Sequence, residues 1–139
     1  MNDRFFLDTN IFAYMFDARA AQKAERARQL IKQAVSTRKG VVSQQVVQEF
    51  FSLALRKFQP AMTLPEAEDY LSTMFQPLLV VQSAQTFKEA LQLHSRYRLP
   101  WYDALIVAAA LESGCEVLYT EDFQHEQRFG ELRVKNPFL

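Results

Sequence analysis

Residues 4–10 read RFFLDTN, and this short stretch sets the interpretation of the whole chain. Its apolar run is rich in phenylalanine and too short for a helix, so it predicts a buried strand over residues 4–8. Asp8 stops that strand with a carboxylate, and apolar residues resume after Asn10. Either the acid only shapes a turn, or it holds something at the edge of a sheet.

The same pattern of short apolar stretches separated by helical segments continues along the chain. Further strands are predicted at residues 41–43, 78–81, 116–120 and 132–134. Helices are predicted over residues 11–16, 18–39, 44–54, 63–75, 83–97 and 100–113, with Ser43, Thr63 and Ser83 as N-terminal caps. No hairpin signal separates the strands, which favours a parallel sheet with helices on both faces. We therefore expect one α/β domain over residues 1–139, with three α/β/α layers and a short, mostly parallel central sheet of about four to five strands.

The composition is typical of a compact protein. The 139 residues include 49% hydrophobic residues and twelve phenylalanines, enough for one core. The lone Cys115 cannot form an internal disulfide, and the sequence has no evident secretory leader or membrane-spanning run. These features predict a cytoplasmic protein that does not enter a membrane.

The formal net charge is zero, but the charges are unevenly distributed. The segment 19–39 carries seven cationic residues and one acid, Glu25, whereas the segment 112–131 carries six acids and one arginine. Two solvated helix faces would explain this distribution. A basic flank beside an acidic pocket would explain it equally well.

Four acids are predicted to lie at the carboxyl edge of the sheet, where ligands of open parallel sheets collect. They come from four separate segments: Asp8 and Asp122 follow strands, while Glu49 and Asp103 lie in the first two turns of helices. Each acid also has an ordinary explanation. Asp8 and Asp122 could stabilise turns, and Asp103 could interact favourably with the positive end of a helix dipole. Glu49 could be a solvated helix residue.

The neighbours of these acids favour a shared site. Asp103 precedes the apolar run ALIVAAAL, and Glu49 is flanked by Val46, Val47, Phe50 and Phe51. Carboxylates in one partly buried cleft repel each other unless they take up protons or a cation is present. Oxygen ligands without a His or Cys cluster suit Mg²⁺ or Mn²⁺, which can activate water and neutralise a phosphate.

Four motifs in this order resemble the PIN domain family, close to the single-domain ribonucleases that serve as toxins of VapBC-type toxin–antitoxin modules. The resemblance covers nearly the whole chain, from Phe5 to Phe138. Its markers are FLDTNIFAY at 6–14, the internal Glu49, LPWYDALIVAAALESGC at 99–115 and VLYTEDF at 117–123.

The resemblance implies a site and an activity. Asp8, Glu49, Asp103 and Asp122 would form the catalytic pocket and hold one or two Mg²⁺ or Mn²⁺ ions. Asn10 would orient Asp8 or a water on the metal, Thr120 would add a supporting hydroxyl, and Glu121 could be an auxiliary ligand in place of, or beside, Asp122.

In this family RNA phosphodiesters are cleaved, the proteins are commonly homodimers, and an antitoxin protein covers the cleft. The basic helix would then contact the RNA backbone through Arg19, Lys23 and Arg26. Two other classes stay open. A phosphoaspartate-type phosphatase would need an acid where Asn10 stands, and a non-catalytic scaffold or interaction module would not need the acids.

Overall fold

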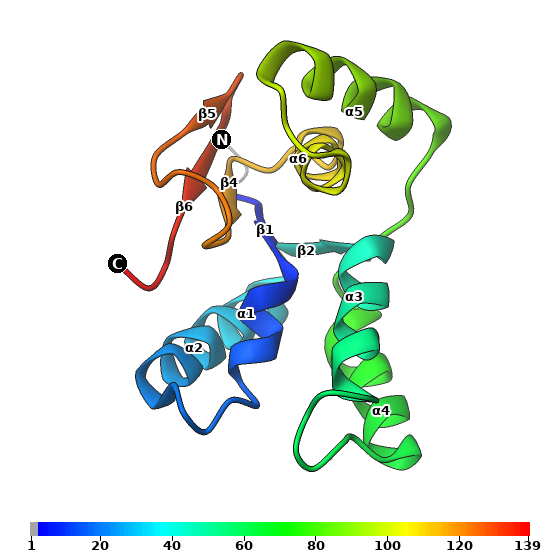
Figure 1. Ribbon diagram of the computed structural model, residues 1–139, viewed down its shortest axis with the longest axis vertical. Helices are drawn as coiled ribbons and strands as arrows, with labels where there is room; N and C mark the ends of the chain where they lie inside the picture. Colours follow the sequence, from blue (N-terminus) through cyan, green and yellow to red (C-terminus); the bar gives the residue numbers. More distant parts are fainter. Residues whose placement is uncertain (1–2) are drawn as a thin grey trace.

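The computed structural model describes residues 3–139, and a single mixed sheet lies at its centre (Figure 1). Within these residues the sheet has six strands in the order β3-β2-β1-β4-β6-β5. The strands are β1 (Phe5–Leu7), β2 (Gly40–Ser43), β3 (Leu79–Val80), β4 (Val117–Tyr119), β5 (Arg128–Phe129) and β6 (Leu132–Lys135). The predicted α/β class and the mostly parallel sheet are confirmed, with one strand more than expected.

All strand pairs except the last are parallel, and β1 lies between β2 and β4. The exception is β5, which pairs antiparallel with β6. The prediction that no hairpin is present is therefore wrong at this edge. Gly130 has a φ of 61° in the turn, a conformation that glycine adopts without steric cost, and β5 is too short to show an apolar pattern.

The helices fall close to their predicted positions. They are α1 (Thr9–Tyr14), α2 (Ala21–Thr37), α3 (Gln44–Ala54), α4 (Leu64–Tyr70), α5 (Ala84–Tyr97) and α6 (Trp101–Glu112), and a π-helix, η1 (Leu71–Phe75), continues α4. Thr63 forms the predicted capping box, and Ser83, predicted only as a cap, forms a second one. Ser43 occupies the N-cap position of α3, but its side chain makes no capping hydrogen bond, so that part of the prediction is wrong.

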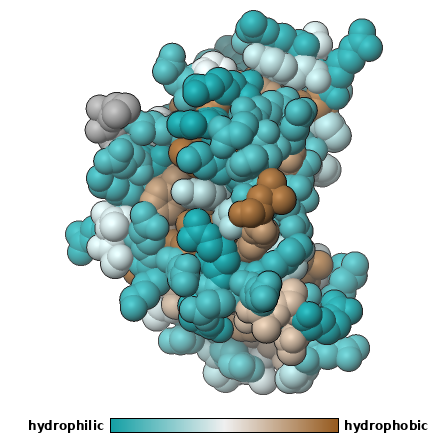
Figure 2. Space-filling view, turned by 90° about the vertical axis from the view of Figure 1, so that its left-hand side faces the viewer, coloured by the Kyte–Doolittle hydropathy of each residue, from teal (hydrophilic) through white to brown (hydrophobic). Residues whose placement is uncertain are grey.

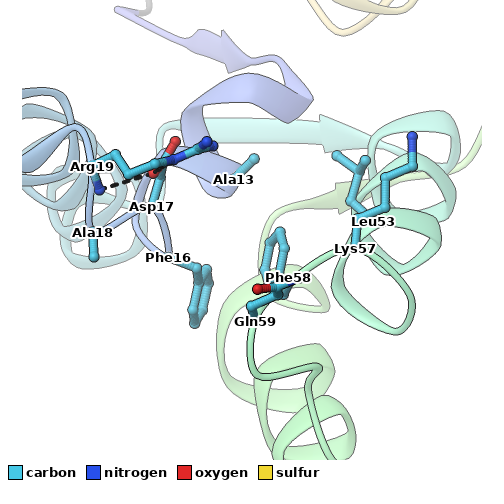
Figure 3. Close-up of a pocket in the computed structure, with 9 residues that line it drawn as sticks. All are labelled: Ala13, Phe16, Asp17, Ala18, Arg19, Leu53, Lys57, Phe58 and Gln59. Atoms are coloured by element: carbon cyan, nitrogen blue, oxygen red, sulfur yellow. Dashed lines mark hydrogen bonds and ion pairs between the residues drawn. The ribbon is translucent and has the colours of Figure 1, made fainter.

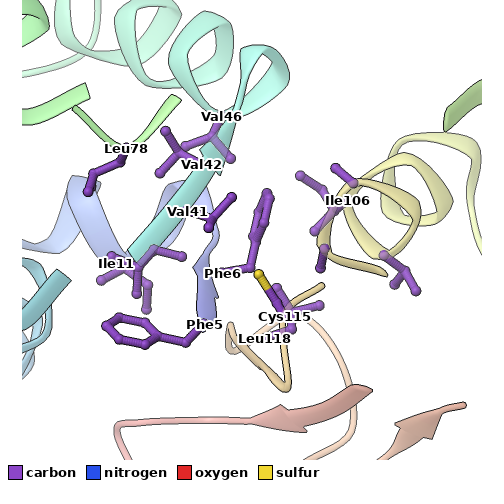
Figure 4. Close-up of a cluster of buried hydrophobic side chains, with 14 of the residues drawn as sticks. Phe5, Phe6, Ile11, Val41, Val42, Val46, Leu78, Ile106, Cys115 and Leu118 are labelled. Carbon is purple, nitrogen blue, oxygen red and sulfur yellow. The ribbon is translucent and has the colours of Figure 1, made fainter. Parts of the chain in front are cut away.

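Helices cover both faces of the sheet because successive side chains of a buried strand point to opposite faces. Phe5 and Phe6 show this directly: one ring points to the side of Ile11, the other to the side of Ile106 on α6 (Figure 4). Helix α2 packs on β2 from the first side, and α6 packs between the sheet and α5 on the other. This is the expected three-layer arrangement.

A second packing region, the aromatic cluster, joins the C-terminal half of α1 to α3 and η1. Phe50 is fully buried at its centre and stacks on Tyr70, with ring centroids 5.1 Å apart and planes 8° apart. Phe12 and Phe75 meet its ring edge to face. The cluster fixes α1 and α3 against each other below the carboxyl edge of the sheet.

One face of the molecule is largely polar. On this face, shown in Figure 2, hydrophobic residues appear only in small patches among hydrophilic ones. Across residues 3–139, no helix combines the length and the apolar character needed to cross a bilayer.

Candidate metal centre

The structure places the four predicted acids as the sequence indicated. Asp8 directly follows β1 and is the N-cap of α1, and Asp122 lies three residues after the end of β4. Glu49 lies in the second turn of α3, and Asp103 in the first turn of α6. Both β1 and β4 end at the same edge because they are parallel neighbours, with Leu7 opposite Tyr119.

Asp8 is the most deeply buried of the four, with 5% of its surface exposed. Its Oδ1 accepts a hydrogen bond from the backbone N–H of Thr9 at 2.7 Å, and its Oδ2 accepts one from Thr120 Oγ1 at 2.9 Å. A charged carboxylate at this depth needs such donors. Asp8 therefore caps α1, as expected if the acid shapes a turn. The two hydrogen bonds also fix the orientation of its carboxylate.

Thr120 and Asn10 connect Asp8 to Asp122. Besides donating to Asp8, Thr120 Oγ1 accepts hydrogen bonds from the Asp122 backbone N–H at 3.1 Å and from Asn10 Nδ2 at 3.3 Å. The same Asn10 nitrogen lies 3.2 Å from Asp122 Oδ2. The predicted supporting positions of Thr120 and Asn10 are thus both in contact with the acids.

Glu49 is held by two donors from different elements. Gln45, one turn earlier on α3, donates Nε2–H to Glu49 Oε1 at 2.6 Å. Thr9 Oγ1 donates to the other oxygen, Oε2, at 3.3 Å. The sequence reasoning missed Gln45. The signal that could have found it is its i, i+4 spacing to Glu49, which places both side chains on one helix face.

The acids influence one another electrostatically. Burial, opposed in part by the hydrogen bonds from Thr9 and Thr120, raises the pKa of Asp8 to about 7, and the charges of Asp122 and Glu49 add to the increase. Partial burial raises the pKa of Asp103 as well, again with contributions from Asp122 and Glu49. Asp8 and Asp103 are therefore both affected by the charges of Glu49 and Asp122, and positive charge supplied nearby would favour the ionised forms of Asp8 and Asp103.

The donor set fits a hard divalent cation in its chemistry. All four acids offer oxygen, and Asn10 Oδ1 is a buried oxygen without a hydrogen-bond partner among residues 3–139. The side chains of the four acids do not converge on one point, however. In this part of the chain, no three Asp, Glu, His or Cys side chains stand close enough together to hold an ion as they are. A cation here would have to draw the carboxylates inward.

Glu121 points into a different environment from Asp122. It accepts hydrogen bonds from the Tyr14 hydroxyl and from Lys23 Nζ, the latter at 3.1 Å. Lys23 Nζ also lies 4.6 Å from the centre of the Tyr14 ring. Glu121 thus connects the loop after β4 to α1 and α2, and of the two neighbouring acids only Asp122 contacts Asn10 and Thr120.

All three predicted RNA contacts have intramolecular partners. Lys23 pairs with Glu121, and Arg26 Nε donates to the Pro137 carbonyl at 3.3 Å. Arg19 pairs with Asp17 but keeps 92% of its side chain exposed. It lines a cavity of about 520 Å³ together with Lys57 and Phe58 (Figure 3).

That cavity lies between the C-terminal ends of α1 and α3 (Figure 3), whereas Asp8 caps the N-terminus of α1 and Glu49 lies in the second turn of α3. The cavity that Arg19 lines is therefore at the other end of α1 from Asp8.

Comparison with known proteins gives a consistent result. The family model described as the PIN domain matches residues 5–128. A comparison with curated proteins finds no match.

Solved structures resemble the chain over nearly its whole length. A toxin–antitoxin complex from Klebsiella pneumoniae aligns with a TM-score of 0.69 at 21% identity, covering 95% of this chain and 96% of the other. A DNA-bound VapBC from Salmonella typhimurium gives 0.71 at 19% identity, covering 96% and 98%. VapC20 from Mycobacterium tuberculosis, described as a toxin that cleaves the sarcin–ricin loop, gives 0.64 at 22% identity, covering 93% and 98%. At these identities the likeness is one of fold.

Proposed function

The chain belongs to the PIN domain family, and we propose that it is a metal-dependent endoribonuclease that acts as the toxin of a VapBC-type module. The observation that carries the proposal is the group of four carboxylates at one sheet edge, in which the buried Asp8 and the partly buried Asp103 each interact with Glu49 and Asp122. Burying an acid and surrounding it with further acids is costly for the fold alone. A bound cation would offset that cost.

In the proposed site, Asp8, Glu49, Asp103 and Asp122 would hold one or two Mg²⁺ or Mn²⁺ ions. A bound ion would supply an activated water and stabilise charge on the phosphate during in-line displacement. The protein's own part is orientation. Thr120 fixes one oxygen of Asp8, and Asn10 ties the Asp122 carboxylate to the same network.

The proposed partners follow from the structural neighbours. Several of them are complexes of a toxin with an antitoxin, and VapC20 is described as cleaving an RNA element. We therefore expect an RNA substrate and a cognate antitoxin for this chain in the cytoplasm, and a homodimer as the assembly. Arg19, Lys23 and Arg26 stay the proposed contacts with the RNA backbone, and Arg19 is the most exposed of the three.

The test is cleavage of RNA by the purified protein with Mn²⁺ as the added metal. Asp8→Asn and Asp103→Asn should each lower the rate by more than about 100-fold, because each removes a charged ligand. EDTA should do the same to the wild type. The matched control is Asp69→Asn, an exposed acid on α4, which should cleave normally.

Normal cleavage by Asp8→Asn or Asp103→Asn would show that the site is assigned wrongly. The alternative, a non-catalytic PIN-like scaffold, predicts no cleavage by the wild type and no thermal stabilisation by Mn²⁺. A working site should gain stability from the ion, because it binds the folded state.

A further inference from the structure

We propose that Gln45 is a positioning residue that holds the Glu49 carboxylate beside the first turn of α6, which carries Asp103, and so favours binding of the cation. The inference rests on the proposed metal-dependent function and goes beyond it, because Gln45 is neither an acid nor part of the motifs that mark the family. Its basis is a set of contacts that join α3 to α6.

The amide of Gln45 bridges two helices that reach the site separately. Its Nε2 lies 2.6 Å from Glu49 Oε1 and 3.1 Å from the carbonyl oxygen of Tyr102. An amide nitrogen has two hydrogens, so it can donate to both acceptors at once. Tyr102 directly precedes Asp103 in the first turn of α6. One side-chain group thus links the Glu49 carboxylate to the backbone that carries Asp103.

The other oxygen of Glu49 is held from the opposite direction. Thr9 Oγ1 donates to Glu49 Oε2, and Thr9 directly follows Asp8. The Glu49 carboxylate is therefore hydrogen-bonded on one side to Thr9, the neighbour of Asp8. On the other side it is hydrogen-bonded to the amide that also contacts Tyr102, the neighbour of Asp103. Donors on both oxygens restrict its rotation while the lone pairs not used by them stay free for a cation.

The burial of Gln45 shows that the side chain is poorly suited to a purely structural role. Only 7% of the residue is exposed, and its Oε1 is a buried atom with no partner within residues 3–139. An unpaired buried oxygen is unfavourable, and an apolar side chain of similar size would avoid it. The gain from glutamine at this position is the pair of N–H donors.

The experiment measures Mn²⁺ affinity by titration calorimetry on metal-free protein. Gln45→Met keeps the side-chain length and removes both donors, and it should weaken Mn²⁺ binding by about 10–100-fold. Its melting temperature without metal should stay within about 4 °C of the wild type, since the unpaired oxygen is lost together with the donors. Gln48→Met is the matched control, an exposed glutamine on the same helix, and should bind Mn²⁺ as the wild type does.

A double variant separates positioning from a general effect on the fold. If Gln45 acts through Glu49, then adding Gln45→Met to Glu49→Gln should weaken Mn²⁺ binding no further, because the carboxylate it positions is already absent. Gln45→Glu keeps the volume, replaces the donors with a second acid and should also weaken binding.

Three results would overturn the inference. The first is equal Mn²⁺ affinity in Gln45→Met and Gln48→Met. The second is an undiminished effect of Gln45→Met in the Glu49→Gln background. The third is a wild type that neither binds Mn²⁺ nor cleaves RNA, and only this result overturns the proposed function as well.

Discussion

Helices α1 and α3 each carry two opposite kinds of environment. Asp8 and Asn10 at the start of α1 and Glu49 in the second turn of α3 belong to the candidate site. The C-terminal halves of both helices hold the aromatic cluster, where Phe12 and Phe50 are fully buried. The candidate site brings together like charges and, among residues 3–139, buried polar atoms without partners. The aromatic cluster brings together rings that pack against one another.

The difference shows how the fold can tolerate its site. Repulsion among the acids acts to separate the two helices at Asp8 and Glu49, whereas the cluster holds them together through Phe12 and Phe50. Because Phe50 directly follows Glu49 and Phe12 lies one turn after Asp8, the cluster keeps the acids in place. We therefore expect stability to depend mainly on the cluster, and pH dependence mainly on the site.

The largest expected effect is on the aromatic side. Phe50→Ala removes a fully buried ring that contacts Phe12, Phe75 and Tyr70, and it should lower the free energy of unfolding by about 3–5 kcal/mol. Urea unfolding measures this. Leu55→Ala, at an exposed residue that ends the same helix, is the control and should change stability by about 0.5 kcal/mol or less. Equal losses in the two variants would remove the distinction between the regions.

The next effect belongs to the acid side and depends on pH. The pKa of Asp8 is raised from 3.8 to about 7 in the folded protein, so the folded state binds more protons than the unfolded state between these values. The stability contributed by protonated Asp8 is complete below pH 3.8 and is lost as the pH rises through 7. For metal-free protein this amounts to roughly 2–4 kcal/mol.

Asp8→Asn removes this titration while it preserves the shape of the side chain. The variant should therefore gain stability relative to the wild type as the pH rises from 5 to 8, in unfolding measured with EDTA present. A constant difference across this range would mean that Asp8 titrates normally. Saturating Mn²⁺ should restore the wild type at pH 8 but not the variant.

The smallest effect tests the connection between the acids. Thr120→Val removes the hydroxyl that donates to Asp8 and accepts from Asn10 and from the Asp122 backbone. The loss should cost about 1–2 kcal/mol at pH 8. It should also raise the pKa of Asp8 further, because the Thr120 hydrogen bond lowers it. Titration of Asp8 followed by carbon NMR measures the shift, and an unchanged pKa would show that Thr120 does not stabilise the carboxylate.

Much of the fold could be predicted because the sequence uses strong local signals. The Thr63 capping box and the apolar helix after Pro100 each mark an element by chemistry that acts within a few residues. The positions of the four acids followed from the same signals, since parallel strands share a carboxyl edge. Here the sequence was sufficient.

The misses have different physical causes. Strand β5 has only two residues, and its pairing with the neighbouring strand β6 defines it. Ser43 has the right residue type for a cap, yet it is fully buried at the end of β2 without using its hydroxyl there. The sequence contains the i, i+4 spacing of Gln45 and Glu49, but no local pattern contains the contact of Gln45 with the carbonyl of Tyr102, 57 positions away.

The pairing of β1 with β4 also bears on how the chain can change in length. Leu7 stands opposite Tyr119, the Asp8 backbone N–H donates to the Tyr119 carbonyl, and Thr120 meets the Asp8 carboxylate one position later. A single residue inserted or deleted between Val117 and Thr120 would turn the Thr120 hydroxyl away from that carboxylate. Changes in length should therefore be tolerated in exposed connections such as residues 59–61, but not at residues 117–120.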